Sequence, residues 1–407
     1  SYKTSHHWRK EALRNTAIFI RFSIISGALF FIALLTAHSG FSAEKANRYR
    51  SHYKAALLAD AASGRILHHD RMHQKIYPAS LVKMMVALIA LGEIETGRIS
   101  LQDSVKVSRR ASKIGGHQVY LKEGEIFKFR ELMEATVIGS ANDASVAVAE
   151  HVLGSDKVFI KRMNERAIEL GMKKTRFYSV HGLPPGRGQQ LDVSSAYDLY
   201  LLALELIKHP QFLRWSSTRL GSFRNGTFQL LNTNHRLIKM YRGMEGMKTG
   251  YHRRAGFNLV SSAKRDGQRY ISIVLGAKNS RMRSKITRHL LDFGFDNYQK
   301  FDLNKIDADV SYSAGVKGGE LENVSLRATE TVSLLLSAEE HQRLEIWPQI
   351  PSQTGAPVKA EQKLGTLEYW LDGKMLKEVA LQTEFAVPEQ SIFSELTSML
   401  TNLSGTN

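Results

Sequence analysis

The chain has 407 residues and a net charge of +17 at pH 7, with 43% hydrophobic and 23% charged residues. This length predicts about two or three domains, and the composition is that of a folded globular protein. There is no cysteine, which excludes disulfide bonds, thiol catalysis and cysteine-ligated metal sites.

The N-terminus has the pattern of an export signal. A basic start precedes an apolar run over residues 22–37, and small residues follow up to Ala43. We therefore expect residues 1–43 to be a signal peptide. A retained membrane anchor is the alternative, because residues 18–20 would lengthen the run, although the run itself is shorter than the roughly 20 residues that a spanning helix needs. Either form would place the rest of the chain outside the cytoplasm.

The charge is unevenly distributed along the chain. Residues 301–407 hold eight Lys/Arg and sixteen Asp/Glu, so the excess of positive charge lies in residues 44–300. A basic region beside an acidic one indicates two domains with different tasks. Nucleic acid is the usual partner of a basic field, but an exported protein meets little of it. We expect no nucleic-acid partner, and instead anionic wall polymers, a membrane surface, or a basic surface that only aids solubility.

Strand patterns occur at both ends of residues 44–300, with helical patterns between them. Residues 53–60 and 65–69 predict a β-hairpin, and residues 257–262 and 270–275 predict two strands around an Asp-Gly turn. The expected helices are residues 81–91, 132–138, 144–152, 157–170, 194–208 and 284–293. The first and last segments should share one antiparallel sheet with the helices grouped on it, which is an α+β fold and one catalytic domain.

The pattern changes near residue 300. Residues 307–386 alternate apolar and polar residues between Gly and Pro breaks, which predicts a small all-β domain over residues 301–387. In residues 388–407 apolar residues recur at helical spacing and predict a short amphipathic helix. Its only charges are Glu389 and Glu395, so it lacks the cations that bind anionic lipid. We expect at most a weak contact with a membrane surface.

Three short motifs follow one another in the basic region. They are the S-x-x-K of Ser80 and Lys83, the S-x-N of Ser140 and Asn142, and Lys248-Thr249-Gly250. The S-x-x-K pattern is expected roughly once or twice by chance in a chain of this length, and the K-T-G tripeptide only about 0.1 times. The full set in this order is typical of serine β-lactamases and penicillin-binding proteins, which transfer an acyl group through a serine.

The first motif supplies a nucleophile and a base. Ser80 and Lys83 are three residues apart at the expected start of a helix, so they share a face and lie within reach of each other. Burial and a second cation, for which Lys248 is the candidate, would lower the pKa of Lys83. The neutral amine would then take the Ser80 proton, while the backbone N–H of Ser80 points at the developing oxyanion.

The other two motifs are expected to serve the substrate. Ser140 and Asn142 fall in a turn between two predicted helices, although Ser and Asn favour turns for conformational reasons alone. From there Ser140 would relay a proton to the leaving amine, and Asn142 would hold the substrate amide or the Lys83 side chain. Lys248-Thr249-Gly250 is expected to open a strand whose edge binds an extended peptide. Its glycine allows close approach, and its Lys and Thr side chains would bind a carboxylate.

The residues around these motifs resemble a known family, the D-alanyl-D-alanine carboxypeptidases, which are low-molecular-mass penicillin-binding proteins of the serine β-lactamase-like superfamily. Residues 77–85 resemble the nucleophile segment of the family. Residues 171–177 with 181–183 resemble its middle signature, and residues 246–260 its third motif. The similarity extends from about residue 53 to about residue 300, and more weakly to about residue 387.

This resemblance implies a periplasmic enzyme that removes the terminal D-alanine from peptidoglycan pentapeptides and is acylated by β-lactam antibiotics. No cofactor and no metal are expected. By this resemblance, Ser80 is the acylated nucleophile, Lys83 is its base, and Ser140 and Asn142 are the groups of the second motif. Lys248 and Thr249, beside Gly250, bind the carboxylate. The backbone N–H groups of Ser80 and Tyr251 form the oxyanion hole. Close relatives carry a histidine where Tyr251 stands, and many lie on the inner membrane through a basic C-terminal helix.

Three other functions compete with this interpretation. A β-lactamase commonly hydrolyses its acyl-enzyme through a glutamate in an E-x-x-L-N loop, and no such string lies between Asn142 and Lys248. The domain after residue 300 also argues against that function. A D,D-endopeptidase differs only in the bond that it cuts, so it stays open. A non-catalytic wall-binding protein would be free to lose motif residues, yet all of them are present.

Overall fold

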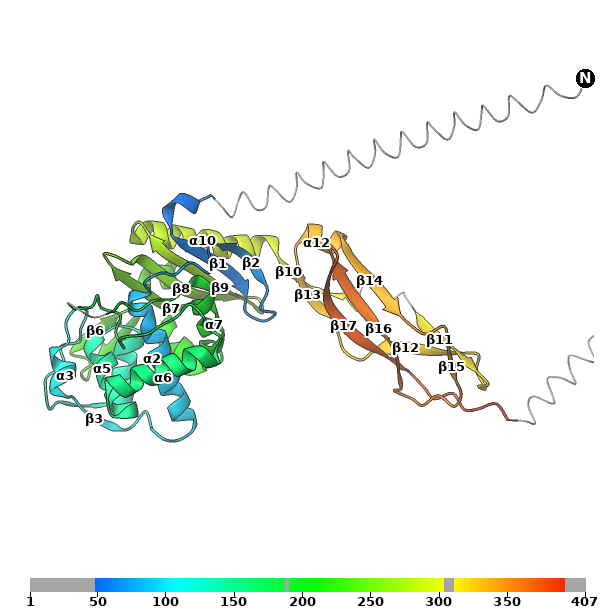
Figure 1. Cartoon of the computed structure of the whole chain (residues 1–407), viewed down its shortest axis with the longest axis horizontal. Coiled ribbons are helices and arrows are strands. Elements are labelled where there is room, and N and C mark those ends of the chain that lie inside the picture. The colour runs from blue at the N-terminus through cyan, green and yellow to red at the C-terminus, as the bar shows by residue number, and fades with distance from the viewer. Residues whose placement is uncertain (1–47, 187–189, 304–310, 392–407) are drawn as a thin grey trace, which may run out of the picture. The chain divides into compact units, whose positions relative to one another are not determined.

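The computed structural model describes residues 48–186, 190–303 and 311–391. The chain divides into two compact units between Gly294 and Phe295 (Figure 1). The predicted signal peptide and residues 392–407 of the predicted C-terminal helix lie outside the described residues. Within the described parts of the chain, no helix is long and apolar enough to cross a membrane.

A five-stranded sheet forms the centre of the first unit. Its order is β2-β1-β9-β8-β7, and every neighbouring pair is antiparallel. The strands are β1 (Ala55–Asp60), β2 (Ile66–Asp70), β7 (Met244–His252), β8 (Gly256–Arg265) and β9 (Gln268–Ala277). Ala55 of the first strand pairs with Leu275 of the last one, so the two ends of this unit share one sheet as predicted.

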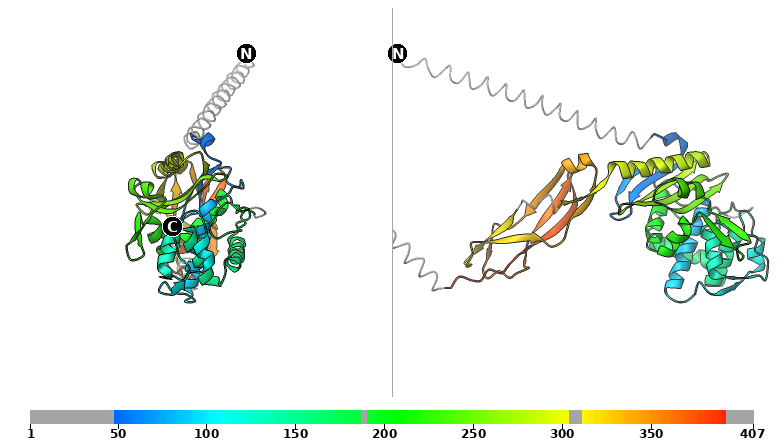
Figure 2. Two further views of the ribbon diagram at one scale, coloured as in Figure 1. Left: turned by 90° about the vertical axis from the view of Figure 1, so that its left-hand side faces the viewer. Right: turned by 180° about the vertical axis from the view of Figure 1, so that it is seen from behind.

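Helices cover both faces of this sheet (Figures 1 and 2). One face contacts α10 (Ser280–Asn297), where Gly294 lies against the side chains of Leu58 and Tyr270. Because side chains alternate between the two faces of a sheet, Leu57 and Ile273 point to the opposite face, where they join the main hydrophobic core. The helices of that side are α2 (Lys83–Glu95), α4 (Phe129–Val137), α5 (Asn142–Leu153), α6 (Asp156–Glu169) and α7 (Ala196–Leu206). This arrangement confirms the predicted α+β fold.

Several short elements of the first unit were not predicted. They are β3 (Ser104–Lys106), α3 (Arg109–Lys113), β4 (Ile126–Lys128), α8 (Pro210–Ser217), β5 (Leu220–Phe223), β6 (Phe228–Leu231) and α9 (His235–Met240). Runs of three to eight residues are too short to show a clear periodicity in sequence. Four of them form two separate antiparallel pairs, β3 with β4 and β5 with β6.

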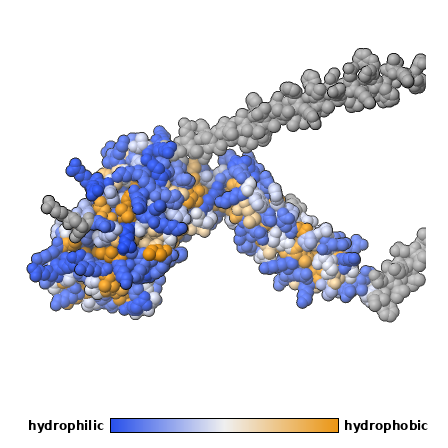
Figure 3. Space-filling view, viewed as in Figure 1, coloured by the Kyte–Doolittle hydropathy of each residue, from blue (hydrophilic) through white to orange (hydrophobic). Residues whose placement is uncertain are grey.

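The second unit is built mainly of antiparallel strands, which confirms the predicted all-β domain. Its main sheet has the order β14-β16-β17-β12-β11-β15, and β10 pairs separately with β13. The strands are β10 (Gln299–Asp302), β11 (Tyr312–Lys317), β12 (Asn323–Ala328), β13 (Ser333–Leu336), β14 (Leu344–Gln349), β15 (Gln353–Gly355), β16 (Lys363–Leu371) and β17 (Lys374–Thr383). A short helix, α12 (Ala338–Gln342), lies between β13 and β14. A core that includes Val324, Leu367 and Leu381 belongs to this unit alone. Hydrophilic residues predominate on the visible surface of each unit (Figure 3).

The K-T-G motif does not open its strand, contrary to the prediction. Strand β7 begins at Met244, so Lys248 lies in its middle. The sequence pattern did not reveal the first residues of β7, because Gly243 and Gly246 have positive φ angles and the register with β8 shifts between Met244 and Gly246. A β-bulge of this kind interrupts the alternation by which a strand is recognised in sequence. Because β7 is at the edge of the sheet, the motif still lies where an extended peptide can add.

Candidate active site

The predicted nucleophile and base meet where a tight turn passes into a buried helix. Ser80 lies in the 3-10 turn η2 (Ala79–Val82), and Lys83 is the first residue of α2. The helix therefore begins two residues later than expected. The predicted contact is nevertheless present, with Lys83 Nζ 3.1 Å from Ser80 Oγ.

Two glycines allow other segments to approach this turn closely. A Cβ atom at Gly182 would lie 2.1 Å from the Ala79 carbonyl oxygen, and one at Gly250 would lie 2.5 Å from the Pro78 carbonyl oxygen. Ala79 itself has a φ angle of 52°, which an L-residue adopts only at a cost. The nucleophile turn is thus clamped between the K-T-G strand and the loop that carries Gly182.

The second motif contacts the base. Lys83 Nζ donates hydrogen bonds to Asn142 Oδ1 at 2.7 Å and to the His181 carbonyl oxygen at 2.9 Å. Asn142 is the first residue of α5 rather than part of the preceding turn, and its Nδ2 donates to the Gly115 carbonyl at 2.8 Å. Of the two alternatives for Asn142, the structure has the contact with the Lys83 side chain.

The third motif meets the second. Lys248 Nζ donates to Ser140 Oγ at 2.7 Å, and the lysine is only 2% exposed. Thr249 Oγ1 donates to Thr233 Oγ1 at 2.7 Å. Tyr251 is 56% exposed, and its ring is stacked on Phe257, with 4.2 Å between the ring centroids. All the side chains predicted for the site therefore lie in one connected cluster, except that of Tyr251, which points to solvent beside it.

Burial makes both lysines unusually acidic. Desolvation, followed by the charge of Lys248, lowers the pKa of Lys83 well below its ordinary value of 10.5. Desolvation and then the charge of Arg283 lower the pKa of Lys248 to about 7. A lysine with a depressed pKa is available as a neutral base near neutral pH, which is the state that general-base chemistry at Ser80 requires.

The sequence analysis missed Arg283. This residue lies on α10, is 8% exposed, and has a pKa that burial lowers to about 10. Its Nε has no hydrogen-bond partner among the described residues. A buried guanidinium costs free energy unless an anion pairs with it, and the charge of Arg283 acts on Lys248. A signal was present in the sequence, because Arg283 falls in phase with the buried Ile286, Thr287 and Leu290.

Backbone groups of the site could not be assigned from side-chain motifs. The His181 and Gly115 carbonyls accept from Lys83 and Asn142, and any residue type supplies a carbonyl. Within the described parts of the chain, no group of three or more His, Asp and Glu side chains is placed to hold a metal ion. The cluster thus brings together a serine, a lysine whose pKa is depressed, and a second buried lysine.

Comparison with known families agrees with this chemistry. Residues 42–279 match the D-alanyl-D-alanine carboxypeptidase family, and residues 298–389 match the C-terminal domain of penicillin-binding protein 5. The chain is 34% identical to D-alanyl-D-alanine carboxypeptidase DacF of Bacillus subtilis over 87% of its length and 92% of that protein. It is 31% identical to DacD of Escherichia coli over 92% of its length and 97% of that protein.

Solved structures give the same assignment. Penicillin-binding protein 5 of Haemophilus influenzae superimposes with a TM-score of 0.66 at 27% identity, over 83% of this chain and 98% of that one. Penicillin-binding protein D2 of Listeria monocytogenes, in its ampicillin-bound form, superimposes with a TM-score of 0.55 at 30% identity, over 60% of this chain and 97% of that one. With its three motifs gathered in one site and these similarities, the chain belongs to the D-alanyl-D-alanine carboxypeptidase family of serine peptidases.

Proposed function

We propose that this protein removes the terminal D-alanine from peptidoglycan stem pentapeptides through an acyl-enzyme on Ser80. The observation that carries the proposal is the set of three hydrogen-bond partners around Lys83 Nζ. A neutral amine has two N–H donors and one lone pair. The Asn142 and His181 oxygens can only accept, so they take the two N–H groups. The lone pair is then directed at the Ser80 hydroxyl, which is the arrangement of a general base.

Acylation follows from this arrangement. Ser80 Oγ attacks the carbonyl carbon of the penultimate D-alanine, while Lys83 accepts the hydroxyl proton. The backbone N–H groups of Ser80 and Tyr251 stabilise the oxyanion. The C–N bond then breaks, and the leaving amine receives a proton from the Lys248 ammonium through Ser140, which accepts a hydrogen bond from Lys248. Proton exchange with water then restores the neutral Lys83 and the charged Lys248. Water hydrolyses the serine ester, which releases the shortened peptide and restores Ser80.

The carboxylate receptor restricts the reaction to the end of a peptide. We assign the terminal carboxylate to Lys248, Thr249 and Arg283, because the first and third are buried cations with depressed pKa values. A negative charge between them restores the electrostatic balance of the site. Gly250 lets the substrate strand pass close to β7.

β-Lactam antibiotics are proposed to acylate the same serine. The ampicillin-bound form of the Listeria relative supports this extension, because that protein shares the fold at 30% identity. We further propose that the enzyme acts in the periplasm after export, on the basis of the predicted signal peptide, and remodels the cell wall there. A weak contact with a membrane surface through residues 388–407 stays part of this proposal.

Incubation with a disaccharide pentapeptide, followed by mass analysis, tests the reaction. Release of one D-alanine is expected, whereas release of a cross-linked partner peptide would indicate an endopeptidase. The Lys83→Ala variant should lose acylation by a fluorescent penicillin. Labelling that persists in Ser80→Ala would refute the assignment of the nucleophile.

A further inference from the structure

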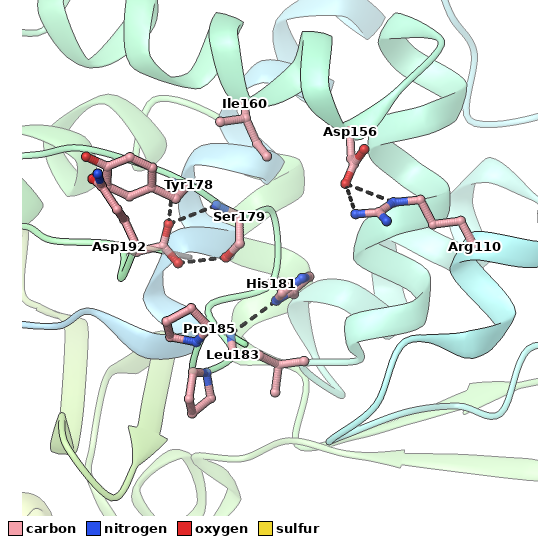
Figure 4. A pocket seen from close by; sticks show the side chains of 11 residues that line it. Arg110, Asp156, Ile160, Tyr178, Ser179, His181, Leu183, Pro185 and Asp192 are labelled. Atoms are coloured by element: carbon pink, nitrogen blue, oxygen red, sulfur yellow. Dashed lines mark hydrogen bonds and ion pairs between the residues drawn. The ribbon is translucent and has the colours of Figure 1, made fainter. Parts of the chain in front are cut away.

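A buried carboxylate lies behind the loop that contacts Lys83. Residues 179–183 of this loop supply the His181 carbonyl, and several of them line a cavity of about 280 Å³ together with Asp192 (Figure 4). Asp192 is only 5% exposed. None of the steps proposed above uses this carboxylate, so its burial needs another explanation.

One peptide group connects the cavity with the base. It is the peptide bond between His181 and Gly182, which is trans. Its carbonyl accepts from Lys83 Nζ at 2.9 Å, and its N–H donates to Ser179 Oγ at 2.8 Å. Because a trans peptide is planar, with its C=O and N–H pointing in opposite directions, holding the N–H also fixes the direction of the carbonyl.

Asp192 in turn fixes the Ser179 hydroxyl. Ser179 Oγ donates to Asp192 Oδ2 at 2.6 Å, and Asp192 Oδ1 accepts from the N–H groups of Tyr178 and Ser179 at 2.6 and 3.0 Å (Figure 4). A hydroxyl has one proton to give. Since Asp192 takes that proton, an oxygen lone pair of Ser179 is left to accept from Gly182.

We propose that Asp192 is a positioning residue for the general base, a role that rests on the acyl transfer proposed above. Through Ser179 and the 181–182 peptide, Asp192 holds the His181 carbonyl against one N–H of Lys83. With the second N–H on Asn142, the lone pair of the amine faces Ser80. When the His181 contact is lost, the amine rotates freely and its lone pair spends less time directed at the nucleophile.

The charge of Asp192 also acts on the base. The titratable groups that influence Lys83 or respond to it are Lys248 on β7, Asp143 on α5, and His117, His181 and Asp192 on the surrounding loops. Asp143 and Asp192 raise the pKa of Lys83, whereas burial and Lys248 lower it. Burial raises the pKa of Asp192 itself, against the hydrogen bonds from Ser179 and Tyr178, which lower it. Above that pKa its carboxylate is charged, and without this charge the pKa of Lys83 falls further, so the base becomes neutral at a lower pH.

A matched control is available on the same stretch of chain. Asp198 on α7 is 1% exposed and accepts hydrogen bonds from the Lys174 N–H and Thr175 Oγ1, both at 2.7 Å. It therefore also holds a loop in place. Among the described residues, none of its hydrogen bonds leads to Lys83. The variants are Ser179→Ala, Asp192→Asn and, as the control, Asp198→Asn, all in the full chain.

Single-turnover acylation by a fluorescent penicillin, measured from pH 5 to 9, gives the readout. Ser179→Ala and Asp192→Asn are expected to lower the acylation rate constant on the pH plateau by roughly tenfold to a hundredfold, as for a misplaced catalytic group. The dissociation constant of the non-covalent complex stays unchanged. Asp192→Asn also moves the acid limb of the profile to lower pH, which a purely structural role would not do. Asp198→Asn changes neither quantity.

Two results would overturn the positioning role. One is a wild-type plateau rate and acid limb in Asp192→Asn together with a wild-type rate in Ser179→Ala. The other is that Asp198→Asn lowers the acylation rate constant as much as Asp192→Asn does, when both variants have lost the same unfolding free energy. In both cases the acyl-enzyme mechanism would stand, because only labelling of Ser80→Ala contradicts it. If Asp192→Asn does not fold, Ser179→Ala carries the test, since it keeps the charge and removes only the hydroxyl.

Discussion

Arg283 changes how the carboxylate site is understood at the scale of single residues. The K-T-G motif alone supplies Lys248 and Thr249, but the Lys248 amine already donates to Ser140, and the Thr249 hydroxyl to Thr233. Arg283 is buried nearby, and its Nε has no partner among the described residues. We therefore propose Arg283 as a further cation for a substrate anion.

Replacement of this arginine should impair recognition of a free C-terminus. In Arg283→Gln we expect kcat/KM for the pentapeptide to fall by roughly 10- to 150-fold, which corresponds to about 1.5–3 kcal/mol for a hydrogen bond to a charged group. Steady-state kinetics on the free peptide and on its C-terminal amide provide the measurement and its control. An equal loss on both substrates would contradict the assignment.

The depressed pKa of Lys248 predicts a pH dependence. Because the pKa of this lysine is about 7, its ammonium form is present below that pH and is lost as the pH rises through it. We therefore expect kcat/KM for the free peptide to decline above about pH 7, with the acid limb set by deprotonation of Lys83. In Arg283→Gln the alkaline limb should move to higher pH, since a charge that lowers the pKa of Lys248 is gone. An alkaline limb at the same pH in both proteins would argue against this coupling.

At the scale of elements, the site depends on segments that pack without side chains between them. Gly182 has a φ angle of 76° and no room for a Cβ atom beside Ala79, whereas Gly154, at the C-terminus of α5, has a φ angle of 78° and nothing within 4 Å. Two glycines with nearly the same φ angle therefore differ in how closely neighbouring atoms approach them.

This pair separates backbone strain from packing. Gly154→Ala should cost about 1 kcal/mol of unfolding free energy and leave acylation unchanged. Gly182→Ala should cost about 1–3 kcal/mol more, because the new methyl group displaces the nucleophile turn, and slow acylation roughly a hundredfold. Urea unfolding and penicillin labelling measure the two effects. Equal unfolding free energies in the two variants would show that the clash is relieved by a small shift.

The secondary-structure elements differ in how well the sequence could predict them. The hairpin of β1 and β2 and the helices α2, α6 and α7 were predicted, α2 from a continuous apolar run and the hairpin from two apolar segments around a turn. Strand β7 was not placed correctly, because glycines with positive φ interrupt its pattern. The three motifs were found from residue type and order alone. Arg283 and the His181 carbonyl were not, because only the fold brings α10 and the 179–183 loop beside β7 and α2.

At the scale of the whole molecule, each unit has a hydrophobic core of its own. Among the described residues, the fully buried members of the core around α2 and the sheet end at Leu275, and those of the core of the β unit begin at Leu303. We therefore propose, in line with the sequence-based boundaries, that the catalytic unit folds alone when α10 is kept complete to Asn297.

A truncated chain tests this independence. Residues 48–297 should unfold in one cooperative transition and be acylated at the rate of the longer chain. As a control, Leu381→Ala in the longer chain should destabilise only the β unit, by about 2–5 kcal/mol, because this fully buried leucine lies in its core. Calorimetry and penicillin labelling give the measurements. Slower acylation in either protein would mean that the β unit supports the site.

The pairing of β1 with β9 affects the order in which parts of the enzyme fold during synthesis. Ser80 is made early, but β1, which first has only β2 as a neighbour, gains the central strand β9 only when the chain has reached Leu275. Contacts between such distant parts of a chain form late and slowly. During synthesis the nucleophile is thus present long before the sheet that clamps it. A chain that ends before β9 would carry Ser80 and Lys83 without the means to align them, so incomplete copies of this enzyme should be inert toward the wall and toward penicillin alike.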